Sequence, residues 1–216
     1  MTVIAVENQK GGAGKTTVAV CLATALMKDG LDVQLVDSDP QGSSSDWHAA
    51  AELAGFEPVK TCQITRPVLH KEALRMPVDV VIIDGVPRNT GMSDSAISAA
   101  DLVIIPVQPS PLDIWATKEL VDKVKDAIEL REGTDRPLKA AFLINRLVSN
   151  TDLGRDVRQA LESYGLPVFE TAIRQRQEYG KTMARGQTPL DLSPKHSAHE
   201  DLVAFKDEVI RFLTNK

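Results

Sequence analysis

The chain of 216 residues has little cysteine, no excess of positive charge and no long apolar run. Its two cysteines, Cys21 and Cys62, fall on an apolar helix stripe and at the end of a strand-like run, which favours packing in a reducing compartment over a disulfide or a metal site. The formal net charge of −5 excludes a strongly basic protein that coats DNA, although it allows a local basic face. No apolar run is long enough to span a membrane, and the sequence opens on a strand pattern rather than a signal peptide, so we expect a cytoplasmic protein.

Strand-like and helix-like segments alternate along the chain. Continuous apolar, β-branched runs are typical of parallel strands buried on both faces, and they predict strands at Val3–Glu7, Val33–Asp37, Val59–Cys62, Val78–Asp84, Leu102–Pro106, Ala140–Asn145 and Pro167–Glu170. Apolar stripes at helical spacing predict helices at Thr17–Lys28, Asp113–Arg131, Gly154–Tyr164 and His199–Leu213. Because there is no repeat, low-complexity tract or linker, we expect a single domain over residues 1–216. The predicted fold is α/β, a doubly wound and mostly parallel sheet flanked by helices, with ligands at the carboxyl ends of its strands.

A glycine-rich turn joins the first predicted strand to the first predicted helix. Residues 10–17 read Lys-Gly-Gly-Ala-Gly-Lys-Thr-Thr. Glycines let the backbone curl so that successive N–H groups and the helix N-terminus point at phosphate oxygens. Lys15 is placed to reach the β- and γ-phosphates, and the hydroxyl of Thr16 to ligate Mg²⁺. The predicted phosphate-binding residues are therefore Gly11, Gly12, Ala13, Gly14, Lys15, Thr16 and Thr17.

Polar residues end three further predicted strands, and all three should meet the loop at one edge of the sheet. Asp37 ends the second strand and is a candidate holder of a Mg²⁺-bound water, while Asp39 is placed to orient the attacking water. Asp84 ends an apolar strand, as a Walker B acid beside Mg²⁺ does. Asn145 ends a late strand, where its amide can read a purine edge. Each carboxylate alone fits a helix cap or a solvated turn equally well, but together with the loop they predict a site for a nucleotide and Mg²⁺.

The sequence resembles the deviant-Walker-A ATPases of the ParA/MinD superfamily, and most of all the short plasmid partition proteins of the ParF type. The resemblance rests on the glycine-rich loop, on residues 36–42, which read Val-Asp-Ser-Asp-Pro-Gln-Gly, and on the segments 105–113 and 171–177. It spans nearly the whole chain. It implies a P-loop NTPase fold of the SIMIBI type, with ATP and Mg²⁺ as cofactors and hydrolysis of ATP as the reaction.

The same resemblance gives a reason for two lysines in one loop. In this family two subunits sandwich two ATP molecules, and the first lysine reaches across to the partner's nucleotide. Lys10 is therefore expected to act in trans, in the role that an arginine finger has elsewhere. The alternative is a solvated surface lysine. The implied catalytic residues are Lys10, Lys15 and Asp39, and the implied metal-binding residues are Thr16, Asp37 and Asp84.

Three positions depart from the expected patterns. Gln9 stands where a standard phosphate loop has its first glycine. Arg88 lies in the switch II turn after the Walker B acid, where the family usually has a small proline-rich turn. A solvated Arg88 is favoured over one that contacts phosphate or the partner subunit. Asn145 matches the adenine-reading position of some relatives only approximately.

Basic residues gather late in the chain, where charge runs are most often solvated faces. Partition ATPases of the family bind DNA non-specifically through basic residues in their C-terminal part, with strong salt dependence. The resemblance thus implies DNA contacts from Arg155, Arg158, Arg174, Arg176, Lys181 and Arg185. We expect no operator-specific binding, because no helix-turn-helix pattern precedes the first strand. MinD-type relatives end in an amphipathic membrane helix, but the outer face of the last predicted helix here mixes both charges, which favours packing on the domain.

The leading expectation is an ATP-hydrolysing DNA partition protein that forms a homodimer on ATP, binds nucleoid DNA in the cytoplasm and is stimulated by a ParB- or ParG-like centromere-binding adaptor. One alternative is a ParA-like ATPase that positions a conjugative relaxosome or another cargo, and another is a MinD-like ATPase recruited to membranes. A synthetase or reductase of the superfamily is a third. The reductase branch needs paired cysteines after the switch regions, and Cys21 and Cys62 are not placed there.

Overall fold

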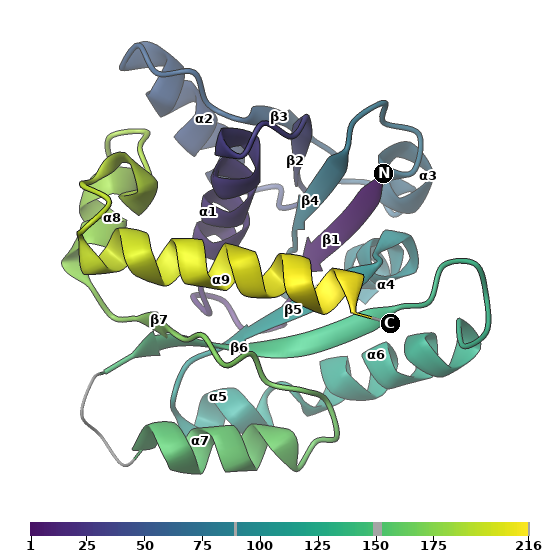
Figure 1. Cartoon of the computed structure of the whole chain (residues 1–216). Helices are drawn as coiled ribbons and strands as arrows, with labels where there is room; N and C mark the ends of the chain where they lie inside the picture. Colours follow the sequence, from purple (N-terminus) through teal and green to yellow (C-terminus); the bar gives the residue numbers. More distant parts are fainter. Residues whose placement is uncertain (89, 149–152, 216) are drawn as a thin grey trace.

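The computed structural model, shown in Figure 1, describes residues 1–88, 90–148 and 153–215. Its described strands form one parallel sheet in the order β3-β2-β4-β1-β5-β6-β7. These strands are β1 (Thr2–Val6), β2 (Val33–Asp37), β3 (Lys60–Gln63), β4 (Val80–Asp84), β5 (Leu102–Val107), β6 (Lys139–Leu147) and β7 (Ile173–Arg174). The first strand of the chain lies in the middle of the sheet, between β4 and β5, which confirms the predicted doubly wound arrangement.

Helices cover both faces of the sheet (Figure 1). One face packs against α1 (Lys15–Lys28), α2 (Ser43–Leu53), α8 (Gln177–Met183) and α9 (Ser197–Thr214). The other packs against α3 (Leu69–Ala73), α4 (Thr90–Ala99), the short α5 (Pro111–Trp115), α6 (Lys118–Leu130) and α7 (Leu153–Glu162). Along β1, Val3 and Ala5 join the second core, and Ile4 and Val6 join the first. Burial on both faces explains why the strands read as continuous apolar runs.

The carboxyl ends of the central strands lie side by side. Val6, the last residue of β1, is paired in register with Asp84 of β4, and Asp84 is also paired with Asp37 of β2. The chain winds from β1 toward β2 and β3 on one side of the sheet and through β5 and β6 on the other. The crevice for a ligand is expected at this reversal of winding.

Two predicted elements are wrong. The predicted strand Pro167–Glu170 forms only an isolated bridge between Val168 and Phe142, and the edge strand is β7 instead. Pro167 has no N–H to donate, and the carboxylate of Glu208 accepts the N–H groups of Glu170 and Thr171 at 2.6 and 2.8 Å, which diverts them from the sheet.

The predicted helix Asp113–Arg131 is divided into α5 and α6. Thr117 lies at the break, where its buried hydroxyl donates to the carbonyl of Ile114 at 2.7 Å. A hydroxyl that bonds the backbone in this way competes with the helical ladder. The patterns of α2, α3, α4 and α8 were not recognised in the sequence.

The last predicted helix packs on the domain as expected. In Figure 1, α9 lies across the sheet face beside α1. Leu202, Phe205 and Val209 are buried, and the ring of Phe205 meets that of Phe169 edge-on with centroids 5.7 Å apart. The apolar stripe of the helix is therefore used inside the protein.

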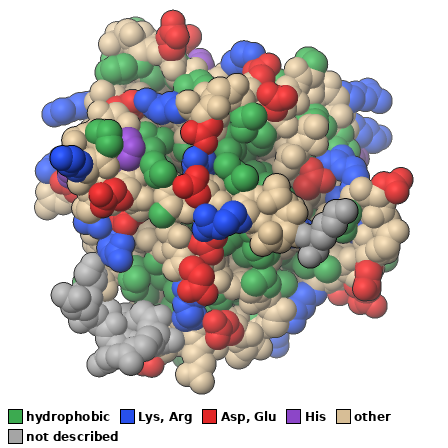
Figure 2. Space-filling view, in the orientation of Figure 1, with side chains coloured by type: hydrophobic (Ala, Val, Ile, Leu, Met, Phe, Trp, Pro, Cys, Tyr) green, Lys and Arg blue, Asp and Glu red, His purple; other side chains and the backbone are tan. Residues whose placement is uncertain are grey.

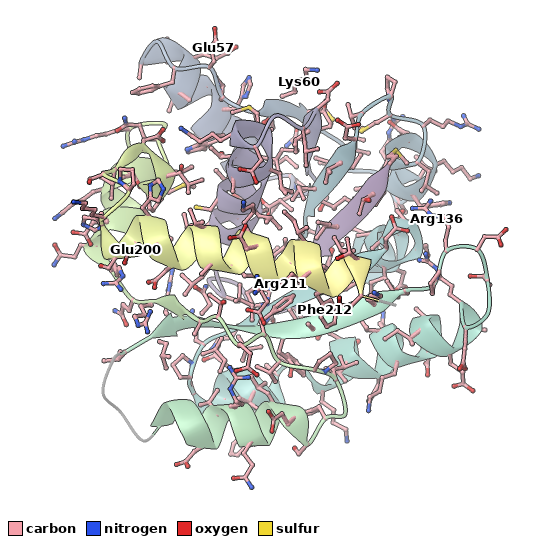
Figure 3. The ribbon with its side chains drawn as sticks, viewed as in Figure 1. Glu57, Lys60, Arg136, Glu200, Arg211 and Phe212 are labelled. Carbon is pink, nitrogen blue, oxygen red and sulfur yellow. The ribbon has the colours of Figure 1, made fainter. Side chains whose placement is uncertain are left out.

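The outer face of α9 carries both charges. Figure 3 shows Glu200 and Arg211 on this helix, and Figure 2 shows acidic and basic side chains interspersed on the surface around it. At the C-terminal end of α9, Lys139 from β6 donates to the carbonyls of Phe212 and Leu213 at 2.9 and 3.0 Å. Within the described ranges, no helix is long and apolar enough to cross a bilayer.

Candidate nucleotide-binding site

The glycine-rich loop follows β1 and leads directly into α1. Gly12 and Gly14 have φ angles of 78° and 95°, a conformation open to glycine but strained for other residues. A Cβ on Gly14 would collide with the amide of Asn145. Asn145 Nδ2 donates to the carbonyl of Ala13 at 2.8 Å, and Gln108 Nε2 donates to that of Gly12 at 2.7 Å. Side chains from β6 and from the end of β5 thus hold the loop open ahead of the helix N-terminus, where an anion binds well.

Lys15 is the first residue of α1, and its ammonium group points back over the loop. Nζ donates to the carbonyl of Lys10 at 3.3 Å, and the side chain is buried. Burial lowers the pKa of Lys15, whereas the negative charges of Glu7, Asp84 and Asp39 act in the opposite sense. The ammonium group has three N–H donors and gives one to the carbonyl of Lys10, so it is arranged to receive phosphate oxygens beside the loop.

Asp84 has the features of a residue that serves a metal ion. It is fully buried, Ser44 donates to its Oδ2 at 2.6 Å, and its Oδ1 has no hydrogen-bond partner among the described residues. Burial raises the pKa of Asp84 to about 7, against the lowering effects of the Ser44 and Thr16 hydroxyls and of Lys15. A buried carboxylate oxygen without a partner, beside the hydroxyl of Thr16, fits a hydrated Mg²⁺ held between phosphates and protein.

Asp37 has a different environment from Asp84. Its Oδ2 accepts from the backbone N–H and the hydroxyl of Ser45, both at 2.9 Å, and its Oδ1 accepts from the N–H of Asp39 at 3.1 Å. Asp37 therefore orients the start of α2 and the backbone of Asp39, while its predicted part in the metal site stays a prediction. In the described part of the chain, no three His, Cys, Asp or Glu side chains gather into a metal-binding cluster.

Asp39 lies half-buried at the rim of the site. Its Oδ1 accepts from the N–H of Gln41 at 2.9 Å, and its carbonyl accepts from Gln63 Nε2 at 3.0 Å. These contacts fix the turn after β2, and the effect of Asp39 on the pKa of Lys15 places its charge near the loop. The position is compatible with the predicted role in orienting water.

Lys10 pairs within its own chain. Its Nζ lies 2.6 Å from Oδ1 of Asp113, in the first turn of α5. The Lys10 side chain is 40% exposed, whereas that of Asp113 is 6% exposed. In the single chain the loop's first lysine is thus held against α5, with its side chain partly exposed.

A cavity of about 330 Å³ opens next to the phosphate loop. Gly14 and Thr17 line it on the side of the loop, and β6 and the chain from β7 through α8 supply the rest of its lining. Asn145 lies in this cavity with its Nδ2 bonded to Ala13 and its Oδ1 accepting the N–H of Arg146 at 3.0 Å. Both of its amide atoms are engaged with the protein, so the predicted reading of a purine edge by Asn145 stays a prediction.

Sequence reasoning missed several residues of this site. Glu7, at the end of the predicted first strand, is fully buried, and burial raises its pKa to about 8. The absence of a Cβ at Gly85 leaves room for the Glu7 carboxylate. Ser44 and Gln108 were also missed. For Glu7 the sequence offered one signal, an acid at the end of an otherwise apolar run. The contacts of Glu7, Ser44 and Gln108 could not be predicted, because they depend on which strands are neighbours in the sheet.

The structure divides the late basic residues into two groups. Arg174 and Arg176 both bond the buried carboxylate of Asp201, at 2.6 and 3.1 Å. Arg158 donates to the carbonyl of Phe169 at 2.7 Å. Lys181 and Arg185 are exposed on and after α8, with no acidic partner in the described part of the chain. The side chain of Arg155 lies outside the described residues.

The model of the CobQ/CobB/MinD/ParA nucleotide-binding domain family matches residues 4–190. The chain belongs to this family. That membership confirms the predicted ParA/MinD superfamily.

Relatives within the family have known names. "Maintenance of carboxysome distribution protein A" of Halothiobacillus neapolitanus is 31% identical over 211 residues, which cover 96% of this chain and 95% of the relative. "Protein ParA" of Rhizobium radiobacter is 29% identical over 223 residues, which cover 99% and 98%. The septum site-determining protein MinD of Pyrococcus horikoshii, solved with Mg-ADP, has the same fold with a TM-score of 0.77 and 18% identity, over 99% of this chain and 97% of that one. The chain is a ParA-type P-loop ATPase, and the Mg-ADP in a protein of the same fold agrees with the predicted cofactors, ATP and Mg²⁺.

Proposed function

We propose that the protein is an ATP-hydrolysing partition protein, which forms a homodimer on ATP, binds non-specific DNA and releases it when a ParB- or ParG-like adaptor stimulates hydrolysis. The observation that carries the proposal is the pair of lysines in one loop. Lys15 is buried over the phosphate site, while Lys10 is held at the surface by Asp113. Lys15 is placed to bind a nucleotide in its own chain, which leaves Lys10 for a nucleotide in a partner.

Each residue of the site then has a separate task. The loop and Lys15 bind and neutralise phosphates, and the free oxygen of Asp84 and the hydroxyl of Thr16 would hold Mg²⁺, which stabilises charge on the phosphates. Asp39 orients the water. Lys10 adds positive charge once a second subunit approaches, so hydrolysis by a single chain would be slow.

DNA binding by this protein would use Lys181 and Arg185, which are exposed and have no acidic partner in the described part of the chain. Arg174 and Arg176 are less suited, because the shared carboxylate of Asp201 already neutralises part of their charge. The sequence-based proposal for Arg158 is weakened in the same way by its contacts with backbone carbonyls. A protein with these properties would be cytoplasmic and associated with the nucleoid.

The test is non-specific DNA binding measured with ATP and with ADP across a salt series. Binding that requires ATP and weakens steeply with salt supports a partition ATPase. If ATP drives dimerisation but neither nucleotide supports DNA binding, the DNA part of the proposal is wrong. If neither nucleotide binds, the proposal as a whole is wrong.

A second function is favoured by the relatives named for carboxysome distribution. The carboxysome distribution protein of Halothiobacillus neapolitanus is 31% identical to this chain, and the ParA protein of Rhizobium radiobacter is 29% identical to it. We therefore keep a positioning ATPase for another cargo, a conjugative relaxosome included, as the alternative. Genes that neighbour this one would separate the two, since a small centromere-binding adaptor indicates partition.

A further inference from the structure

Arg146 has a backbone conformation that arginine rarely adopts. Its φ of 55° lies in the left-handed region, which is strained for a residue with a Cβ. The pairing of β6 with β7 is irregular at this point, because Asn145 pairs with Ile173 and Leu147 pairs with Arg174. Arg146 is thus an extra residue, as in a β-bulge. Bulges next to functional sites re-aim a side chain.

Contacts to the phosphate loop hold this strained turn in place. Oδ1 of Asn145 accepts the N–H of Arg146 at 3.0 Å, and Nδ2 of the same side chain donates to the carbonyl of Ala13 at 2.8 Å. Asn145 is buried, so these contacts are shielded from water. The conformation of Arg146 is therefore coupled to the loop that would bind phosphates.

Arg146 lines the cavity of about 330 Å³ beside the loop. Ile173, Tyr179 and Met183 give the same cavity an apolar lining, and the hydroxyl of Tyr179 is buried without a partner among the described residues. A flat heterocycle attached to phosphates in the loop would extend into this space. The size and the mixed lining are those of a small-ligand pocket.

Of the three arginines that line this cavity, Arg146 is the one that forms no ion pair with an acidic group in the described ranges. Arg174 and Arg176 also line it, but both bond Asp201. The Arg146 side chain is exposed, and no acidic group in the described ranges pairs with it. An unpaired guanidinium is planar and weakly hydrated, so it stacks well on an aromatic face.

We propose that Arg146 determines base specificity, by stacking its guanidinium on the purine of a nucleotide whose phosphates lie in the loop. This inference rests on the proposed function, since it needs a bound nucleotide. Glycine or asparagine would relieve the backbone strain, but neither offers a planar cation. Lysine keeps the charge without the planar face.

The test compares the affinities of wild type, Arg146→Gly and Arg146→Lys for ADP, UDP and pyrophosphate by calorimetry. Both variants are expected to bind ADP about tenfold more weakly, to lose less affinity for UDP, and to bind pyrophosphate as wild type does. Arg146→Gly should also raise the midpoint of thermal unfolding without ligand, because it removes the strain.

Arg88→Gly is the matched control. Arg88 is also exposed and left-handed, with φ 58°, but it does not line this cavity. Its replacement should raise the unfolding midpoint and leave the ADP affinity unchanged. The inference is overturned if Arg146→Lys binds ADP as wild type does, if pyrophosphate loses as much affinity as ADP, or if Arg146→Gly lowers the unfolding midpoint. Wild-type protein that binds neither ADP nor pyrophosphate would overturn the proposed function along with it.

Discussion

Single residues around the phosphate loop differ in how freely they can be replaced. Gly14 combines a left-handed backbone with the close approach of Asn145, while Gly11, in the same loop, has open space where a Cβ would lie. The two lysines of the loop also differ in burial, since Lys10 is held at the surface by Asp113 and Lys15 is buried. Neighbours in the sequence thus carry different constraints.

Gly14→Ala is expected to lower the free energy of unfolding by about 1–3 kcal/mol, because it adds backbone strain and a collision with Asn145. Gly11→Ala should stay within about 0.5 kcal/mol of wild type. Urea denaturation without nucleotide measures both. Equal losses in the two variants would contradict the assigned contact between Gly14 and Asn145.

Lys10→Ala is expected to keep wild-type affinity for ADP and to lose ATP-driven dimerisation. Asp113→Asn should favour the ATP dimer by up to about fivefold for each of its two subunits, because neither Lys10 then has to break an ion pair worth at most about 1 kcal/mol. Sedimentation with ATP and with ADP measures the dimer. A Lys10→Ala protein with unchanged turnover and dimerisation would rule out the role in trans, and an Asp113→Asn dimer that is weaker than wild type would show that Asp113 acts in the dimer itself.

Helix α9 closes one core of the protein by means of a few large side chains. Phe205 is fully buried and meets Phe169, whereas Ile210, on the same helix, is exposed. The helix also carries Asp201, which holds Arg174 and Arg176 at the cavity beside the loop. It contributes to stability and to the nucleotide site together.

Phe205→Ala is expected to lower the free energy of unfolding by about 3–5 kcal/mol, as for other large aromatic residues removed from a core. Ile210→Ala should change it by no more than about 0.5 kcal/mol. Urea denaturation gives the values. If Phe205→Ala leaves the free energy of unfolding unchanged and binds lipid vesicles more weakly than wild type, α9 is a membrane-binding helix instead.

The sequence predicted those elements whose signals are local. Strands β4 and β5 are recognisable because both of their faces are buried, and the loop and Asp84 because their chemistry follows a strand directly. The segment Pro167–Glu170 was misread, because the carboxylate of Glu208, on α9, takes its N–H groups. The pair of Lys10 and Asp113 was also out of reach, since it requires knowing that the end of β5 lies beside β1.

The charge of the whole molecule is a net −5, and the face shown in Figure 2 mixes acidic and basic side chains. Arg174 and Arg176 are paired with Asp201 within the chain, whereas Lys181 and Arg185, which were also predicted to contact DNA, are exposed and have no acidic partner in the described ranges. Lys181 and Arg185 are the pair on which such binding would depend.

The double variant Lys181→Ala/Arg185→Ala is expected to weaken ATP-dependent DNA binding and to reduce the slope of log affinity against log salt by about 0.9 for each phosphate that the protein no longer neutralises. The matched control is Lys71→Ala/Arg75→Ala, which removes the same charge from exposed residues on and after α3, over the opposite face of the sheet. Filter binding across a salt series measures both. Equal effects of the two double variants would indicate a response to net charge alone.

The central place of β1 also determines when the site can appear during folding. In the sequence, β2, β3 and the helices between them separate β1 from its neighbours β4 and β5. Val6 therefore cannot pair with Asp84, nor Ile4 with Leu102, until those later strands are present. Contacts so far apart in sequence are slow to form. The loop that follows β1 then still needs Gln108 and Asn145 to hold it. A growing chain would therefore carry its phosphate-binding motif for most of its synthesis without being able to use it, and would gain affinity for nucleotide in one late step.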